Sequence, residues 1–217
     1  MSENRNIMSE NEAIRLGEEI RQRLENNNHS YSFTKLLNEI KEKKEQIENV
    51  SKDEKSDQAK IFLSSEWEDV LRQAFLIDEL GISLKLFNTK NEMKEYLSTY
   101  YKISSLQGNS YITKNNEKYE IGMFRFDILG FIHELGHIVQ GDVVKAGEIL
   151  WDRPETDEGE RRLNIFARSF WMPRKLFEKI VVENSVNGEC MLKKVADFFA
   201  VDYTSVYLRG KELCFWN

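Results

Sequence analysis

The chain has 217 residues, of which 41% are hydrophobic and 12% aromatic, so it carries enough apolar material for a buried core. Its formal net charge of −6 argues against broad, charge-driven binding to nucleic acid. No uninterrupted apolar run is long enough to span a bilayer. We therefore expect a globular protein with no membrane segment and no direct contact with nucleic acid.

The compartment is predicted from the chain start and from the cysteines. The first six residues lack the apolar core of a signal peptide. The two cysteines, Cys190 and Cys214, are most simply free thiols of a reducing compartment, with a disulfide between them as the open alternative. These features predict a cytoplasmic protein.

Residues 1–60 are polar and charged, and we interpret them as a helical N-terminal extension of the domain formed by residues 61–217. Two helices are expected there, because apolar residues recur at helical spacing: Ile14, Ile20 and Leu24, then Phe33, Leu36, Leu37, Ile40 and Ile47. The charged stretch from Val50 to Lys60 has the composition of a linker or an exposed helix end.

From residue 64 onward, helical and strand patterns alternate. The expected elements are a helix over 64–80 ended by Gly81, a strand over 82–86, a helix over 92–101, strands over 110–113 and 118–123 joined by a polar turn, a helix over 124–139, and helices over 160–171 and 175–183 separated at Met172-Pro173. We predict an α+β fold that is mainly helical, with a small antiparallel sheet.

The C-terminal residues 192–213 predict a pair of helices with a short turn at Val201-Asp202. The arrangement is similar to a helix-turn-helix, but the second helix has no run of arginines. We therefore expect the pair to close the core.

The stretch around which the chain is organised is His133-Glu134-Leu135-Gly136-His137. In a helix, side chains four residues apart lie on the same face, so both imidazoles can reach one metal ion. Glu134 points in a different direction, where it can contact a water on the metal and act as a general base. This is the His-Glu-x-x-His pattern of zinc peptidases. Two of the three histidines of the chain are in this motif, within an apolar segment where unpaired imidazoles would be costly.

A catalytic zinc site needs a third protein ligand and leaves one position for water. No histidine follows His137 closely, so we expect a carboxylate from a later helix. Glu160 fits best, because it opens the next apolar helix; the remaining alternatives are Glu155, Asp157 and Glu158. A negative charge in a first helical turn is also common without a metal.

Several segments together resemble the ImmA/IrrE family of zinc metallopeptidases over about residues 65–213. The resemblance rests on the His133–His137 motif, on Glu160 with Asn164-Ile165-Phe166-Ala167 and Trp171-Met172-Pro173, on Leu192–Val201, and on Ala74–Ile82. Leu163 and Arg162 depart from the residues that the family usually has there. The resemblance implies a zincin-like core and a bacterial or phage-borne protease of narrow specificity that cleaves or inactivates a helix-turn-helix repressor of a mobile element, phage or stress operon.

The reaction predicted from these residues is zinc-dependent hydrolysis of a peptide bond. Zn²⁺ held by His133, His137 and Glu160 acidifies its water, and Glu134 takes the proton and delivers it to the leaving amine. Tyr111, Tyr119 and Arg153 are available as a second donor to the oxyanion. The alternative hypothesis is a zinc-stabilised regulatory domain that binds a repressor or another partner without cutting it.

Overall fold

The computed structural model describes residues 8–27, 32–52, 71–75, 77, 80–106, 108–115, 118–124, 127–142, 146–151 and 158–216, with the backbone alone over 43–52. The chain divides into two compact units, one formed by Met1–Arg23 with Arg153–Asn217 and the other by Leu24–Asp152. The predicted boundary near residue 60 lies outside the described residues. No helix in the described ranges has the length and apolar character needed to cross a membrane.

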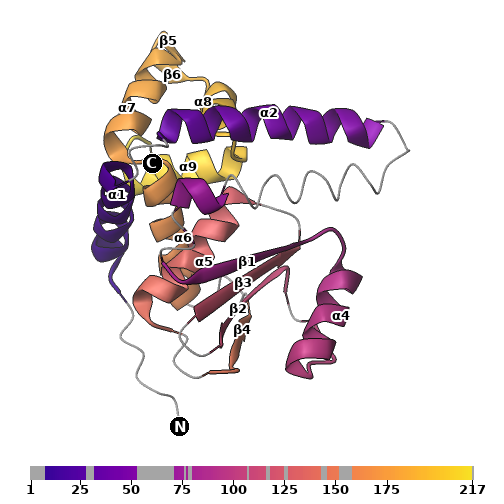
Figure 1. Ribbon diagram of the computed structural model, residues 1–217. Helices are drawn as coiled ribbons and strands as arrows, with labels where there is room; N and C mark the ends of the chain where they lie inside the picture. Colours follow the sequence, from indigo (N-terminus) through magenta and orange to yellow (C-terminus); the bar gives the residue numbers. More distant parts are fainter. Residues whose placement is uncertain are drawn as a thin grey trace. The chain divides into compact units, whose positions relative to one another are not determined.

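The unit of residues 24–152 contains a four-stranded sheet and several helices (Figure 1). Its elements are α2 (Phe33–Lys52), β1 (Ile82–Phe87), α4 (Lys90–Tyr101), β2 (Ser110–Asn115), β3 (Lys118–Phe124), α5 (Ile128–Gln140) and β4 (Ile149–Trp151). The helices and the three longer strands match the sequence prediction in type and approximate bounds. The predicted helix over 64–80 lies largely outside the described residues, which show helix at 71–75.

The sheet has the strand order β1-β3-β2-β4 and is mixed, so the prediction of an antiparallel sheet is wrong in part. β2 is antiparallel to β3 and to β4, but β1 runs parallel to β3, with Ile82 opposite Tyr119 and Phe87 opposite Phe124. Alternation of apolar and polar residues shows which face of a strand is buried, but it does not show the strand's neighbour or direction. The three-residue strand β4 is too short to leave such a pattern and was not predicted.

Helices α4 and α5 cover opposite faces of this sheet. Tyr111 packs with Met93 and Leu97 of α4, whereas the adjacent Ser110 contacts Glu134 of α5. Successive residues of a strand point to opposite faces, so this single pair of neighbours assigns one helix to each side. The motif helix therefore lies on the face to which Ser110 points.

The face under α4 carries a cluster of tyrosines around one carboxylate. Tyr96, Tyr101 and Tyr111 all donate their hydroxyl protons to Glu120 of β3, at 2.9, 3.1 and 2.9 Å. Burial, reinforced by the charge of Glu120, raises the pKa of Tyr101 to about 12 and raises the pKa of Tyr96 and of Tyr111 as well. The cluster joins α4 to the sheet through hydrogen bonds as well as through apolar packing.

The other unit combines most of the first helix with the C-terminal part of the chain. Its elements are α1 (Glu10–Asn27), of which the part up to Arg23 belongs to this unit, α6 (Glu158–Trp171), α7 (Arg174–Glu183), the short strands β5 (Ser185–Val186) and β6 (Glu189–Cys190), α8 (Leu192–Phe199) and α9 (Tyr203–Glu212). The helices were predicted from their periodicity, and Met172-Pro173 separates α6 from α7 as expected. The hairpin of β5 and β6 has only two residues in each strand and was not predicted.

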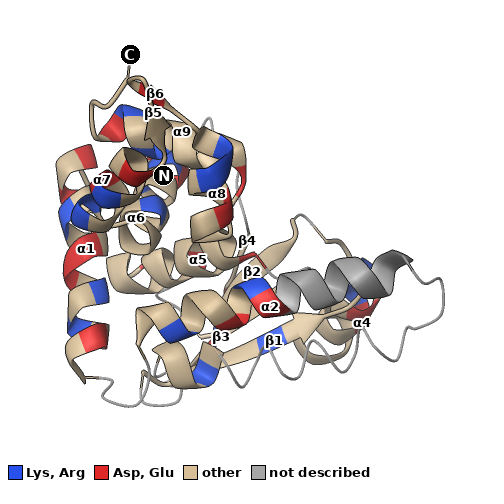
Figure 2. Ribbon diagram, turned by 90° about the horizontal axis from the view of Figure 1, so that it is seen from above, with Lys and Arg blue, Asp and Glu red and all other residues tan. Residues whose placement is uncertain are grey.

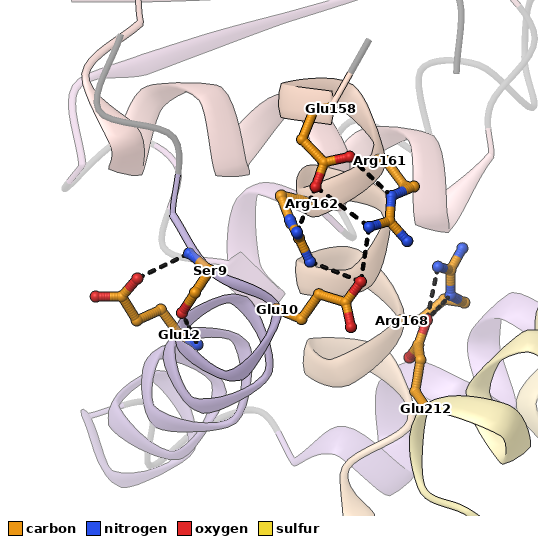
Figure 3. A network of polar contacts seen from close by, with 8 residues as sticks. All are labelled: Ser9, Glu10, Glu12, Glu158, Arg161, Arg162, Arg168 and Glu212. Carbon is orange, nitrogen blue, oxygen red and sulfur yellow. Dashed lines mark hydrogen bonds and ion pairs between the residues drawn. The ribbon is translucent and has the colours of Figure 1, made fainter. Parts of the chain in front are cut away.

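Helix α1 begins with a reciprocal cap and packs closely on α6. Ser9 and Glu12 cap each other, the Ser9 N–H donating to the Glu12 carboxylate at 2.8 Å and the Glu12 N–H to Ser9 Oγ at 3.3 Å (Figure 3). A Cβ on Gly17 would lie 2.6 Å from the carbonyl oxygen of Phe166, so only glycine permits this approach. Glu10 forms ion pairs with Arg161 and Arg162 at 2.7 Å each (Figure 3).

The interior of this unit is organised around Arg209 of α9, which is 0% exposed. Its guanidinium donates to the carbonyl of Met172 at 2.9 Å and to Ser169 Oγ at 2.9 Å, and it pairs with Glu18 and Glu212 at 2.9 and 3.3 Å. Burial lowers the pKa of Arg209, and the two carboxylates oppose that shift. The expected packing of the last two helices is confirmed, because Val195, Phe199 and Val206 are fully buried.

Candidate metal centre

Helix α5, which carries the His-Glu-x-x-His motif, has a defined beginning and end. The Asp127 side chain accepts a hydrogen bond from the Gly130 N–H at 3.0 Å and caps the N-terminus. Gly141 ends the helix in the left-handed conformation, with φ +76°, which a residue with a side chain rarely adopts. Glu134 is the only Asp, Glu, Lys or Arg in this helix, so α5 is almost entirely tan in Figure 2.

The two histidines of the motif lie one turn apart and are both buried, as the pattern predicts. The centroids of their rings are 5.0 Å apart, and the ring planes make an angle of 71°. This geometry brings two imidazoles to one side of α5. Imidazole nitrogen is a ligand that zinc and other divalent transition metals accept.

The turn after α5 brings the carboxylate of Asp142 into contact with the second histidine of the motif, His137. The Asp142 N–H donates to the carbonyl of His137 at 3.1 Å, and Asp142 Oδ2 lies 2.8 Å from His137 Nδ1. A carboxylate only accepts, so this contact assigns the ring proton to Nδ1 and leaves the lone pair of Nε2 for another partner. The same arrangement orients histidine ligands in metal sites.

The sequence analysis predicted a helix over 124–139 and gave Asp142, which follows it, no role. The signal was present: a glycine at the fourth position after His137 turns the chain back, and an aspartate follows it. A left-handed residue at the helix end brings the next residues close to the last helical turn.

The third predicted ligand, Glu160, is in the first turn of α6 and is buried. His133, His137 and Glu160 each offer one ligand atom, and these atoms all lie within 4.8 Å of one another. The group could therefore hold a metal ion, and its donor set of two imidazoles and one carboxylate fits zinc; the identity of the metal stays a prediction.

Three other acidic residues, Glu155, Asp157 and Glu158, were considered as the third metal ligand. Glu158 is about half exposed and forms ion pairs with Arg161 and Arg162 (Figure 3). Glu155 and Asp157 lie outside the described residues. Among the acidic residues considered for the third position, Glu160 is the one in the group that could hold an ion.

Glu134, the predicted general base, is 3% exposed and receives a hydrogen bond from Ser110 of β2. The distance from Ser110 Oγ to Glu134 Oε1 is 2.5 Å, at the short end of the range for a hydrogen bond from a hydroxyl to a carboxylate. Sequence reasoning placed Ser110 in a strand but did not connect it to the motif. That connection depends on which face of β2 packs against α5, and the sequence does not contain this information in local form.

The three residues considered as donors to an oxyanion have different surroundings. Tyr111 points to the α4 side of the sheet, where its hydroxyl donates to Glu120, so it lies on the face opposite to Glu134. The ring of Tyr119 lies under Lys114 Nζ, 5.2 Å from it. Arg153 lies outside the described residues. The structure removes Tyr111 from this set.

Both cysteines are free, as predicted for this chain, and neither belongs to the group that could hold an ion.

Comparisons with models of protein families, with curated proteins and with solved structures gave no match.

Proposed function

We propose that the protein is a zinc-dependent endopeptidase of narrow specificity. The observation that carries the proposal is the buried group of His133, His137 and Glu160, with Glu134 between the two histidines in the sequence. Two imidazoles and one carboxylate are a donor set that catalytic zinc sites use.

In the proposed reaction His133, His137 and Glu160 hold the metal, and Asp142 keeps His137 in the tautomer that can coordinate. When bound, zinc supplies Lewis acidity, which lowers the pKa of a coordinated water from 15.7 to about 7. Glu134 accepts the proton of the attacking water and later delivers it to the leaving amine. The low exposure of Glu134 keeps competing bulk water away from that carboxylate.

The substrate is proposed from the resemblance of the sequence to ImmA/IrrE peptidases. It is a helix-turn-helix repressor of a mobile element, phage or stress operon, acted on in the cytoplasm. The zincin-like character of the core belongs to the same proposal.

The test uses the zinc-loaded protein, the proteins encoded beside its gene and a pool of internally quenched peptides. Glu134→Gln keeps zinc and loses cleavage by about 10²–10⁴-fold, the usual contribution of a general base. His133→Ala loses both zinc and cleavage. Wild-type cleavage by Glu134→Gln would remove Glu134 from the mechanism, and a partner that stays intact in a stable complex would replace the peptidase by a binding regulator.

A further inference from the structure

The hydroxyl of Ser110 donates a hydrogen bond to the carboxylate of Glu134, the general base of the proposed reaction. We propose that Ser110 is a positioning residue, which holds the Glu134 carboxylate in the orientation needed for proton transfer; this inference rests on the proposed function. The observation behind it is the 2.5 Å hydrogen bond from Ser110 Oγ to Glu134 Oε1, between two side chains that are 7% and 3% exposed.

Ser110 is itself held firmly, because it starts β2 at a point where the sheet is well paired. It lies opposite Met123 in the antiparallel ladder with β3. Next to it, the Phe124 N–H donates to the carbonyl of Asn109 at 2.7 Å. A hydroxyl on a paired strand is a fixed reference point for a side chain on the neighbouring helix.

Glu134 needs such a reference point. The last torsion of a glutamate side chain has a broad energy profile, so its own preferences do not fix the plane of the carboxylate. A general base must approach the proton that it takes to about 2.6–3.2 Å. A hydrogen bond on Oε1 sets the rotation of the carboxylate and thereby aims Oε2.

The alternative is that Ser110 only satisfies a buried carboxylate and so stabilises the fold. The two roles differ in what a substitution changes. A stabilising role lowers the unfolding temperature and leaves a folded, zinc-loaded variant as active as wild type. A positioning role impairs every process that uses the orientation of Glu134, even where the variant is folded and holds zinc.

Thr113 provides a matched control on the same strand. It is 0% exposed, and its Oγ1 has no hydrogen-bond partner in the described part of the chain. Thr113→Val therefore removes a buried hydroxyl from β2 without removing a hydrogen bond. Any general effect of hydroxyl loss from this strand appears in Thr113→Val as well.

The experiment compares wild type with Ser110→Ala, Ser110→Thr, Thr113→Val and Glu134→Gln. Zinc affinity is measured by competition with a chromophoric chelator, and the probe of the base is acetohydroxamate, a small zinc ligand whose acidic proton needs a nearby carboxylate. Its affinity for the zinc-loaded protein is measured by calorimetry, and cleavage is followed with the peptide pool.

We expect Ser110→Ala to keep zinc affinity within about twofold but to lose about tenfold or more in acetohydroxamate affinity and in cleavage, the factor for losing one hydrogen bond to a charged group. Ser110→Thr, which keeps the hydroxyl, restores most of both, and Thr113→Val matches wild type. If Ser110→Ala does not fold, Ser110→Cys replaces it, because a thiol is a weaker hydrogen-bond donor than a hydroxyl. We expect Ser110→Cys to lose acetohydroxamate affinity and cleavage by less than tenfold but measurably. Wild-type values for Ser110→Cys would overturn the proposal.

The proposal is also overturned if folded Ser110→Ala equals wild type in both measurements while Glu134→Gln is impaired. Wild-type cleavage by Glu134→Gln is a different result, since it removes the proposed function itself.

Discussion

Two buried polar centres of this protein balance their charge in different ways. Arg209 brings a positive charge into the interior, and the matching carboxylates are those of Glu18 from α1 and of Glu212, three residues further along α9. The motif group brings two imidazoles and the carboxylate of Glu160, all buried. The motif group could hold a metal ion, whereas the charge of Arg209 is already matched by carboxylates of its own unit.

The largest expected effect is on the Arg209 centre. Arg209→Met leaves Glu18 and Glu212 without their buried partner, and we expect a loss of about 3 kcal/mol in the free energy of unfolding. This value is the lower end for a broken buried pair, because Glu18 is partly exposed and Glu212 also pairs with Arg168 at 2.6 Å. The measurement is urea unfolding, with zinc and with a chelator.

Unfolding measured with zinc and with a chelator distinguishes the Arg209 centre from the motif group. The loss in Arg209→Met should be the same with and without zinc, since this centre needs no metal. Arg174→Met is the control, because Arg174 is half exposed and its pair with Glu178 spans 3.6 Å; it should change stability by less than about 0.5 kcal/mol. A loss in Arg209→Met that zinc abolishes would contradict the distinction between the centres.

The next effect concerns the support of His137. Asp142→Asn weakens the hold on the imidazole, and we expect zinc affinity to fall by about 10–100-fold. Chelator competition measures it. Asp127→Asn, at the other end of α5, is the control: asparagine caps a helix as well as aspartate does, so zinc affinity should stay unchanged. Equal affinities for Asp142→Asn and wild type would show that the contact does not support a metal ligand.

Of the two centres, only the motif group could be predicted from the sequence. The spacing of His133 and His137 fixes their common face, because helical geometry is local, and the apolar residues around them indicate burial. The pairing of β1 with β3, the strand β4 and the contact from Ser110 to Glu134 depend on segments distant in the chain, so no local pattern encodes them. Arg209 was not predicted as a buried centre, because arginine is usually exposed and its partners Glu18 and Glu212 lie far away or on an ordinary helical face.

The smallest effect is expected in a third polar cluster, in which three tyrosine hydroxyls donate hydrogen bonds to Glu120. The pKa of Tyr101 is raised from 10.0 to about 12, and the pKa of Tyr96 and of Tyr111 is raised too. Between pH 10 and pH 12 the tyrosines of the unfolded chain lose protons that the native protein keeps. The contribution of these tyrosines to the free energy of unfolding is therefore complete below about pH 10 and falls as the pH rises toward 12.

Urea unfolding from pH 8 to 11, with tyrosinate absorbance as the second signal, measures this decline. Glu120→Gln removes the charge that contributes to the raised pKa values, so its stability should fall less steeply above pH 10. The same slope in Glu120→Gln and wild type would mean that Glu120 does not hold these protons. The decline should not depend on zinc, which separates this cluster from the motif group.

The most direct test of the central claim is a crystal structure of the zinc-loaded protein with anomalous diffraction data at the zinc edge. We expect one strong peak per chain, bonded at about 2.0–2.2 Å to a nitrogen of His133, a nitrogen of His137 and a carboxylate oxygen of Glu160. A peak bonded to other residues, or a zinc ion between the two histidines with Glu160 turned away from it, would contradict the account.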